Sequence, residues 1–256
     1  MSSTLAADLA QALDLLDPVD LFRRAIGEPD AWQERVLHST ARKLVMVTGR
    51  QCGKSTCVAV LAIHLAMTVN GSTVLLVAPS LRQSSLLFST VMGVYKKLTG
   101  MDDPEAESKL SVLFSNQSRI VALPGNGGDT IRGFSADAVF CDEAARIPIE
   151  TLEACRPMMA VRKKSRLVLL TSASWAQGWL WDIWNNAGDK TWQREKVTAL
   201  ECARIDPVWL EGERREMGER AYRREYLCEF LDPAESLFGS ALLEAAINDN
   251  IKVIRF

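Results

Sequence analysis

The feature that most constrains this chain is a glycine-containing loop between a short apolar run and an apolar helix. Residues 44–48 have the composition of a buried strand, and residues 54–69 that of a helix. The loop and first helical turn read Gly49-Arg50-Gln51-Cys52-Gly53-Lys54-Ser55-Thr56. Backbone N–H groups of such a loop, together with the positive end of the next helix, bind phosphate oxygens. We therefore predict that residues 49–56 bind the phosphates of a nucleotide.

Two side chains at the start of this helix have the chemistry that a bound triphosphate requires. Lys54 is expected to reach the β- and γ-phosphates, and Ser55 to place its hydroxyl on Mg²⁺. The loop departs from the standard pattern, because Thr48 stands where a glycine is usual and Gly49 comes one place late. An ordinary glycine turn ahead of a helix is the alternative interpretation.

Two adjacent acids follow a second apolar run. Residues 138–141 are typical of a buried strand, and Asp142 and Glu143 come directly after it. We predict that Asp142 holds Mg²⁺ through its water shell and that Glu143 orients the attacking water. Acids also end strands for no catalytic reason, so the pair gains weight from the phosphate loop. Both motifs fall at carboxyl ends of strands, where open α/β sheets bind ligands.

Weaker signals complete the predicted site. Thr171, Ser172 and Ser174 follow the apolar run 167–170 and could sense the γ-phosphate, although a plain strand exit fits equally well. Gln33 offers a donor and an acceptor that match the edge of adenine, or is a surface residue of a short helix.

Arginines are the remaining catalytic candidates, because phosphoryl transfer gains from a guanidinium on the γ-phosphate. Arg50 is the candidate within the same subunit, and Arg132 the candidate to reach a neighbouring subunit. Either could instead be a solvated surface arginine. The basic cluster 162–166 precedes the strand 167–170, so we expect it at the opposite edge of the sheet.

Alternation of apolar strands and helices predicts an α/β fold with a mainly parallel sheet flanked by helices. With the phosphate loop, this is a P-loop NTPase of RecA/ASCE-like type. The predicted strands are 44–48, 74–77, 138–141 and 167–170, with a hairpin of 111–114 and 119–123. The predicted helices are 54–69, 80–98 and 148–160.

Helical segments are expected to flank this core. Residues 4–40 read as helical, with a break at Pro18 and a cap at Asp30, and the charged stretch 206–228 reads as helical again. We divide the chain into an N-terminal helical segment 1–40 that carries Gln33, a P-loop ATPase core 41–200 and a helical lid or linker 201–256. Arginines and acids alternate within 213–225, which predicts a salt-bridged helix face.

Composition excludes several other classes of protein. The formal net charge of −2 argues against a wholly basic nucleic-acid coat. The 6 cysteines form no C-x-x-C pair, which favours reduced, mostly buried thiols over zinc ligation or a disulfide framework. The chain opens without a signal-peptide pattern, and no apolar run approaches the roughly 20 residues that span a bilayer. We expect a soluble protein that does not enter a membrane.

At this point the chain resembles the ATPase part of the large terminase subunits of tailed phages. Residues 50–55 resemble the variant phosphate loop of that family, in which Arg-Gln replaces the glycine-rich opening. Residues 79–83 are similar to its Ala-Pro-x-x-x-Gln segment, and residues 131–133 and 171–174 fall in the family's order. Residues 222–230 resemble the stretch that closes its ATPase domain.

The resemblance implies a Mg²⁺-dependent ATPase that translocates double-stranded DNA into a procapsid. It implies a homo-oligomeric ring that works with the viral portal protein and the small terminase subunit, in the host cytoplasm and transiently docked on the procapsid. The family's nuclease domain is not expected here, because the sequence ends at Phe256. A superfamily-2-like helicase or translocase and a non-hydrolysing ATP-binding scaffold are the alternatives.

Overall fold

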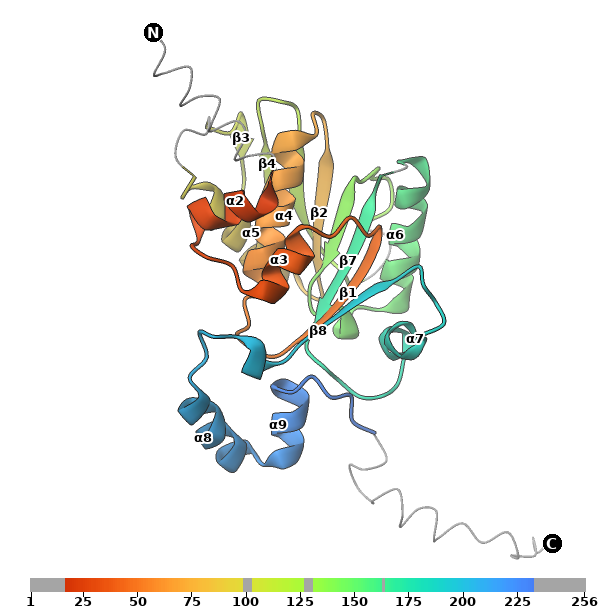
Figure 1. Ribbon diagram of the computed structural model, residues 1–256. Coiled ribbons are helices and arrows are strands. Elements are labelled where there is room, and N and C mark those ends of the chain that lie inside the picture. Colours follow the sequence, from red (N-terminus) through yellow and green to blue (C-terminus); the bar gives the residue numbers. More distant parts are fainter. Residues whose placement is uncertain (1–16, 99–102, 127–130, 163, 233–256) are drawn as a thin grey trace, which may run out of the picture.

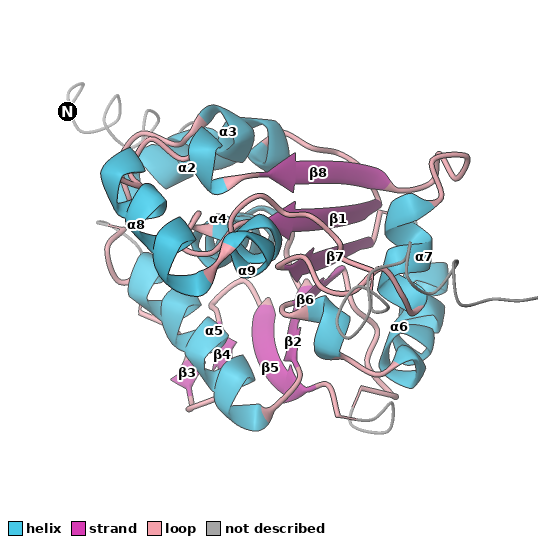
Figure 2. Ribbon diagram, turned by 90° about the horizontal axis from the view of Figure 1, so that it is seen from below, coloured by secondary structure: helices cyan, strands magenta, loops and turns pink. Residues whose placement is uncertain are grey.

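The computed structural model describes residues 17–98, 103–126, 131–162 and 164–232. An eight-stranded sheet with the order β3-β4-β5-β2-β6-β7-β1-β8 forms its centre (Figures 1 and 2). Neighbouring strands run parallel from β5 to β8, and β3, β4 and β5 pair antiparallel. The sheet is therefore mainly parallel, as the sequence predicts.

The strands have the following bounds. They are β1 (Lys43–Thr48), β2 (Thr73–Ala78), β3 (Ala106–Glu107), β4 (Ser111–Leu113), β5 (Arg119–Pro124), β6 (Ala138–Cys141), β7 (Arg166–Thr171) and β8 (Gln193–Val197). The α-helices are α2 (Pro18–Ala25), α3 (Ala31–Leu37), α4 (Lys54–Thr68), α5 (Leu81–Tyr95), α6 (Ile149–Val161), α7 (Trp179–Asn185), α8 (Pro207–Met217) and α9 (Glu219–Glu225). Two short 3₁₀ helices are η2 (Ala144–Arg146) and η3 (Ala199–Glu201).

Alternate residues of the central strands build two cores on opposite faces of the sheet. Leu44 and Met46 of β1 join the core that includes α2, α3, α4 and α5. Val45, between them, joins the core that includes α6 and α7. Figure 1 shows these two groups of helices on opposite sides of the sheet. Because both faces are covered, the strands are apolar throughout, which is why their positions could be predicted.

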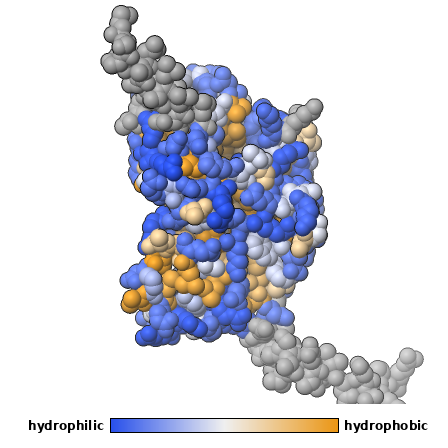
Figure 3. All heavy atoms as spheres, viewed as in Figure 1, coloured by the Kyte–Doolittle hydropathy of each residue, from blue (hydrophilic) through white to orange (hydrophobic). Residues whose placement is uncertain are grey.

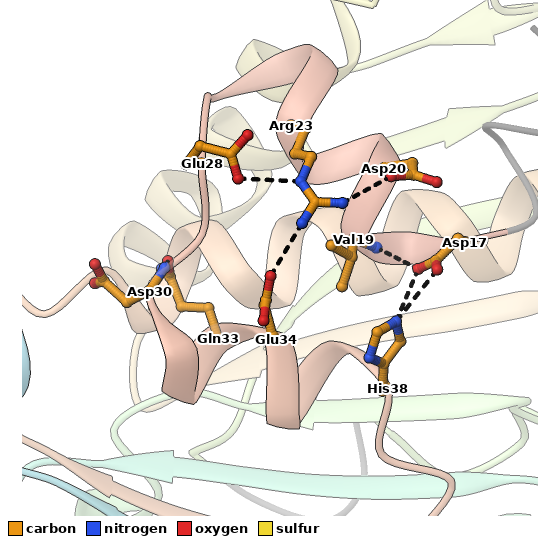
Figure 4. Close-up of polar contacts among 9 residues, drawn as sticks. All are labelled: Asp17, Val19, Asp20, Arg23, Glu28, Asp30, Gln33, Glu34 and His38. Carbon is orange, nitrogen blue, oxygen red and sulfur yellow. Dashed lines mark hydrogen bonds and ion pairs between the residues drawn. The ribbon is translucent and has the colours of Figure 1, made fainter.

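The N-terminal helices form a layer against α4 that is fixed by polar contacts (Figure 4). Pro18 is the first residue of α2, and the Asp17 side chain accepts a hydrogen bond from the Val19 N–H at 2.8 Å. Proline suits this position because its missing N–H would have no partner there. Pro18 therefore begins a helix, and the predicted helical run before it lies outside the described residues.

Arg23 ties the two N-terminal helices together. Its guanidinium contacts Asp20 at 2.9 Å within α2, and Glu34 of α3 at 3.1 Å. Asp30 precedes α3 in a capping box with Gln33, as predicted for the cap. The layer thus holds Gln33 in a fixed orientation next to the core.

Beyond β7 the structure contains elements that sequence patterns did not indicate. Polar strand β8 pairs parallel with β1 at the edge of the sheet, and α7 carries part of the tryptophan-rich stretch. The charged segment predicted as helical forms two helices, because Gly218 interrupts it with a φ of +80°. Ion pairs such as Arg215–Glu211 and Arg214–Glu219 confirm that α8 and α9 have a salt-bridged face.

The surface is mostly hydrophilic, with an apolar patch over α8 in the lower part of the molecule (Figure 3). Val208 and Trp209 are 79% and 46% exposed there. All six cysteines lie in the described residues, and each is free and buried. Among the described helices, none combines the length and the apolar character needed to cross a bilayer.

Candidate nucleotide-binding site

A cavity of about 780 Å³ lies where β1 and β7 end. Its wall includes all of residues 49–56, all of residues 171–175, and Glu143. The phosphate loop, the second acid and the coupling segment are therefore brought to one place. This follows from topology, because β6, β7 and β1 are adjacent parallel strands whose carboxyl ends share one edge.

Gly49 occupies a position that leaves no room for a side chain. Its N–H donates to the Val197 carbonyl at 2.8 Å. A Cβ placed on it would lie 3.0 Å from the Ala199 nitrogen and 3.0 Å from the Tyr226 carbonyl oxygen. Thr48, one residue earlier, is fully buried at the end of β1. The glycine thus stands one place late because the backbone approach that requires it occurs at residue 49.

The phosphate loop turns into α4 through left-handed backbone. Gly53 precedes the helix with a φ of +90°, and Gln51 has a φ of +61°. Helix α4 begins at Lys54, so its unpaired N-terminal N–H groups face the loop. This strand–loop–helix context is the one in which such loops bind phosphate.

Lys54 connects the loop to both acids. Its Nζ lies 2.8 Å from Oε1 of Glu143 and 3.9 Å from Oδ1 of Asp142. Ser55 donates a hydrogen bond to the Asp142 carboxylate. The residues predicted to bind the γ-phosphate, Mg²⁺ and the attacking water are therefore neighbours in space, although 87 residues separate Ser55 from Asp142 (142 − 55).

Burial raises the pKa of Asp142 above its ordinary value of 3.8, and the Lys54 ammonium opposes that rise. A buried carboxylate next to a lysine and a serine hydroxyl lacks part of its hydration. Such a group gains from a divalent cation, because the cation replaces the lost solvation. Ser55 and Asp142 together supply the hard oxygen donors that Mg²⁺ prefers.

Glu143 is held in an uncommon backbone conformation. Its φ of +49° lies in the left-handed region, and its N–H donates to Asp142 Oδ1 at 3.0 Å. A non-glycine residue there costs about 1–3 kcal/mol, and such strain concentrates at functional sites. The conformation turns the chain sharply after β6, so both acids reach the cavity edge of the sheet.

The predicted coupling residues lie at the end of β7. Thr171, Ser172 and Ser174 all line the cavity. Thr171 is buried, and its hydroxyl donates to the Ser172 carbonyl at 2.8 Å, which tightens the exit from the strand. Their place beside the phosphate loop is compatible with sensing the γ-phosphate, and that role stays a prediction.

Arg50 lines the cavity, but α9 holds its guanidinium. Arg50 Nε lies 2.7 Å from Oε2 of Glu225, and Arg224 Nη2 lies 2.9 Å from the other oxygen of that carboxylate. Glu225 is thus shared by two arginines on the cavity wall. The predicted contact of Arg50 with the γ-phosphate would require this pair to open or Glu225 to move with it.

Arg204 is a cavity residue that sequence reasoning missed. Its Nη2 donates to the Cys52 carbonyl at 2.8 Å and pairs with Asp30 at 2.9 Å. It therefore fixes the phosphate loop to the start of α3. No motif surrounds this arginine, so only the fold brings it to the loop. Arg146 and Trp175 also line the cavity and had no signal of their own.

Gln33 lies behind the loop and outside the cavity wall. It is completely buried, and its Oε1 accepts from the Asp30 N–H at 2.8 Å. Its Nε2 has no hydrogen-bond partner among the described residues and lies 3.1 Å from a Cβ placed on Gly53. The acceptor expected to read adenine is thus occupied, and the adenine contact stays a prediction.

Arg132 is exposed and does not line the cavity, within the described part of the chain. The residues just before it, 127–130, lie outside the described ranges. The structure therefore separates it from the arginines around the phosphate loop, and its predicted action on a neighbouring subunit remains a prediction.

The sheet order and the site together define the class of fold. A phosphate loop after β1, acids after β6 and the intervening strand β7 form the RecA-like, P-loop arrangement. A sequence model described as "Terminase large subunit, T4likevirus-type, N-terminal" matches residues 45–244. This match covers most of the chain, so the protein belongs to the N-terminal family of phage large terminase subunits.

Individual relatives agree with this assignment. The large terminase subunit of Thermus phage G20c is 28% identical over 262 residues, a match that covers 88% of this chain and 53% of the relative. The large terminase subunit of Thermus virus P23-45 matches to the same extent. The chain thus spans about half the length of the curated relatives it matches.

Solved structures of terminases share the fold. The ATPase domain of the large terminase of Thermus phage P74-26 superposes with a TM-score of 0.69 at 23% identity, covering 84% of this chain and 100% of that domain. The large terminase of bacteriophage HK97 gives a TM-score of 0.69 at 15% identity, covering 84% of this chain and 55% of that protein. A large terminase from a thermophilic bacteriophage, solved with ADP, gives 0.66 at 13% identity and covers 85% and 53%.

Proposed function

We propose that this protein is a Mg²⁺-dependent ATPase that powers DNA packaging as part of a phage large terminase. The observation that carries the proposal is the position of Lys54 Nζ, 2.8 Å from Glu143 and 3.9 Å from Asp142 at the wall of the cavity. An ammonium and two acids at the end of a phosphate loop are the groups that hydrolysis of a nucleoside triphosphate needs.

Each residue has a chemical role in this proposal. The backbone N–H groups of residues 49–53 and the Lys54 ammonium bind the phosphate oxygens. Ser55 and Asp142 hold Mg²⁺, which supplies positive charge at the phosphates. Glu143 accepts a proton from the attacking water, and Thr171, Ser172 and Ser174 report the loss of the γ-phosphate to the rest of the domain. In the absence of nucleotide, Glu143 neutralises Lys54.

The biological setting in this proposal follows from membership in the family. Double-stranded DNA is the polymer that is moved, and a ring of copies of this domain acts on it. The viral portal protein, the small terminase subunit and the procapsid are the proposed partners, and the host cytoplasm is the proposed location. Arg132 of one subunit is proposed to complete the site of its neighbour.

ATPase measurements on the full chain with and without double-stranded DNA test the enzymatic part. Lys54→Ala should abolish ATP binding, whereas Glu143→Gln should retain binding and lose turnover. Unchanged turnover in Lys54→Ala would contradict the role of the loop. Nucleotide binding without turnover in the wild-type protein would instead indicate a scaffold.

Two further assays test the motor. A strand-unwinding assay distinguishes a helicase, which separates strands, from a terminase motor, which moves intact duplex. Mixing Arg132→Ala with Glu143→Gln tests action between subunits, because the second protein has a dead site and an intact Arg132. Recovery of turnover in the mixture is expected, and no recovery at any ratio would argue against the role of Arg132.

A further inference from the structure

Four arginines line the cavity, and three of them are held by other groups. Arg50 and Arg224 share the carboxylate of Glu225, at 2.7 and 2.9 Å. Arg204 pairs with Asp30 at 2.9 Å and donates to a loop carbonyl. A guanidinium already satisfied by a carboxylate must lose that pair before it can bind a phosphate.

The fourth arginine, Arg146, is exposed on the cavity wall. Within the described residues, its guanidinium makes no hydrogen bond or ion pair. It therefore differs from the other three in being available to an anion without the rupture of an existing contact. No sequence motif marks it, and neither the family match nor the predicted roles assign it a function.

The backbone of Arg146 is tightly linked to Glu143. Arg146 ends η2, and its N–H donates to the Glu143 carbonyl at 2.8 Å. A 3₁₀ helix rises about 2.0 Å per residue, so the two Cα atoms are about 6 Å apart along its axis. Ala144 and Ile147 on either side are buried and anchor the turn. The guanidinium is thus presented from a rigid segment that begins at the catalytic acid.

We propose that Arg146 contacts the γ-phosphate in its own subunit and stabilises the charge that develops there during hydrolysis. This inference rests on the proposed function and adds a catalytic residue to it. A guanidinium offers forked N–H donors that match two phosphate oxygens, and it contributes most where charge develops in the transition state. Arg146 thereby takes the role within one subunit that the sequence suggests for Arg50.

The variants Arg146→Ala and Arg146→Lys, in the full chain, test this assignment. The matched control is Arg156→Ala, because Arg156 is also exposed but lies beside Trp192 at the amino ends of the strands. We expect Arg146→Ala to lower kcat by about 10³-fold, as for other arginines placed on the γ-phosphate. Arg146→Lys should recover part of this loss, and Arg156→Ala should behave as the wild type.

A binding measurement separates transition-state stabilisation from simple affinity. Arg146→Ala should bind a non-hydrolysable ATP analogue within about twofold of wild type, because a transition-state contact adds little to ground-state binding. It should lose most of its affinity for ADP with aluminium fluoride, which imitates the phosphoryl group in transfer. Equal weakening of both ligands would overturn the proposal and make Arg146 a general phosphate contact.

Mixed proteins decide which subunit Arg146 serves. Glu143→Gln carries an intact Arg146, so it would restore turnover to Arg146→Ala only if the residue acted on a neighbour. No recovery is expected, and recovery would overturn action in the same subunit. If Lys54→Ala and Glu143→Gln lack their effects, the proposed function fails. If they show them while Arg146→Ala matches Arg156→Ala, only this inference fails.

Discussion

Arg50 and Glu225 join the phosphate loop to α9 through both main chain and side chain. The Arg50 N–H donates to the Glu225 carbonyl at 2.9 Å, and Arg50 Nε lies 2.7 Å from the carboxylate. The two residues are 175 positions apart in the sequence. The C-terminal helices are therefore linked directly to the place where the phosphates of the proposed substrate bind.

Removing the charge of Glu225 should tighten nucleotide binding. Glu225→Gln deletes an anion from the cavity wall and releases two guanidinium groups. Unit charges about 4 Å apart in water interact by about 1 kcal/mol, so we expect about fivefold tighter binding of ATP at low salt. Titration with a fluorescent ATP analogue measures this, and the gain should shrink as salt is added.

Glu229→Gln is the matched control for that experiment. Glu229 pairs with Arg223, and neither residue lines the cavity, so its removal should leave the affinity unchanged. Weaker binding in Glu225→Gln would show that the pair positions Arg50 more than it restrains it.

Asp142→Asn should stabilise the nucleotide-free protein at neutral pH. The folded pKa of Asp142 lies above the ordinary 3.8, so the folded state holds the proton more tightly than the unfolded state. The free energy of unfolding therefore falls as the pH rises from 3.8 through the raised pKa, and this cost is complete at neutral pH. Asparagine removes it, and each kcal/mol recovered raises Tm by about 2–4 °C.

Thermal unfolding at several pH values checks this sign. The difference in Tm between Asp142→Asn and wild type should vanish at low pH and grow toward neutrality. The variant should also lose the stabilisation that Mg²⁺ with nucleotide gives the wild type. Asp189→Asn is a control of opposite sign, because hydrogen bonds from Thr191 lower the pKa of Asp189. A Tm difference for Asp142→Asn that does not depend on pH would contradict this account.

Gly49→Ala should destabilise the protein. The added Cβ would lie 3.0 Å from two backbone atoms, so the loop or its neighbours must shift. Overpacking of this kind costs about 1–3 kcal/mol. Chemical denaturation measures the change, with Gly93→Ala as the control, because nothing lies within 4 Å of a Cβ on Gly93 in α5. That control should gain about 0.5–1 kcal/mol, and equal behaviour of the two variants would refute the packing argument.

Arg204→Ala should weaken ATP binding with little change in kcat. The arginine fixes the Cys52 carbonyl and Asp30, so its loss loosens the loop without removing a group from the reacting atoms. We expect KM for ATP to rise by about three- to tenfold, within the range for hydrogen bonds to charged groups at an exposed position. Arg215→Ala, which removes an exposed pair on α8, is the control. A fall in kcat at constant KM would instead make Arg204 part of the chemistry.

Sequence patterns predicted most of the central sheet because β1, β2, β6 and β7 are covered on both faces and so are continuously apolar. They failed for β8, an edge strand whose alternate residues are polar, and for the break between α8 and α9. Gln33 shows a different failure. Its residue type suggested a ligand contact, but its acceptor is used in the capping box of α3.

The sequence by itself determined the local chemistry: residues 49–56 specify a loop and helix start, and Asp142-Glu143 specify two acids after a strand. These assignments succeed because each depends on backbone structure within a few residues. Only the tertiary structure decided which distant groups share the cavity. It placed Lys54 against Glu143, gave Arg50 to Glu225, and left Arg146 without a partner among the described residues. Such contacts depend on the order of strands in the sheet, which short sequence patterns do not encode.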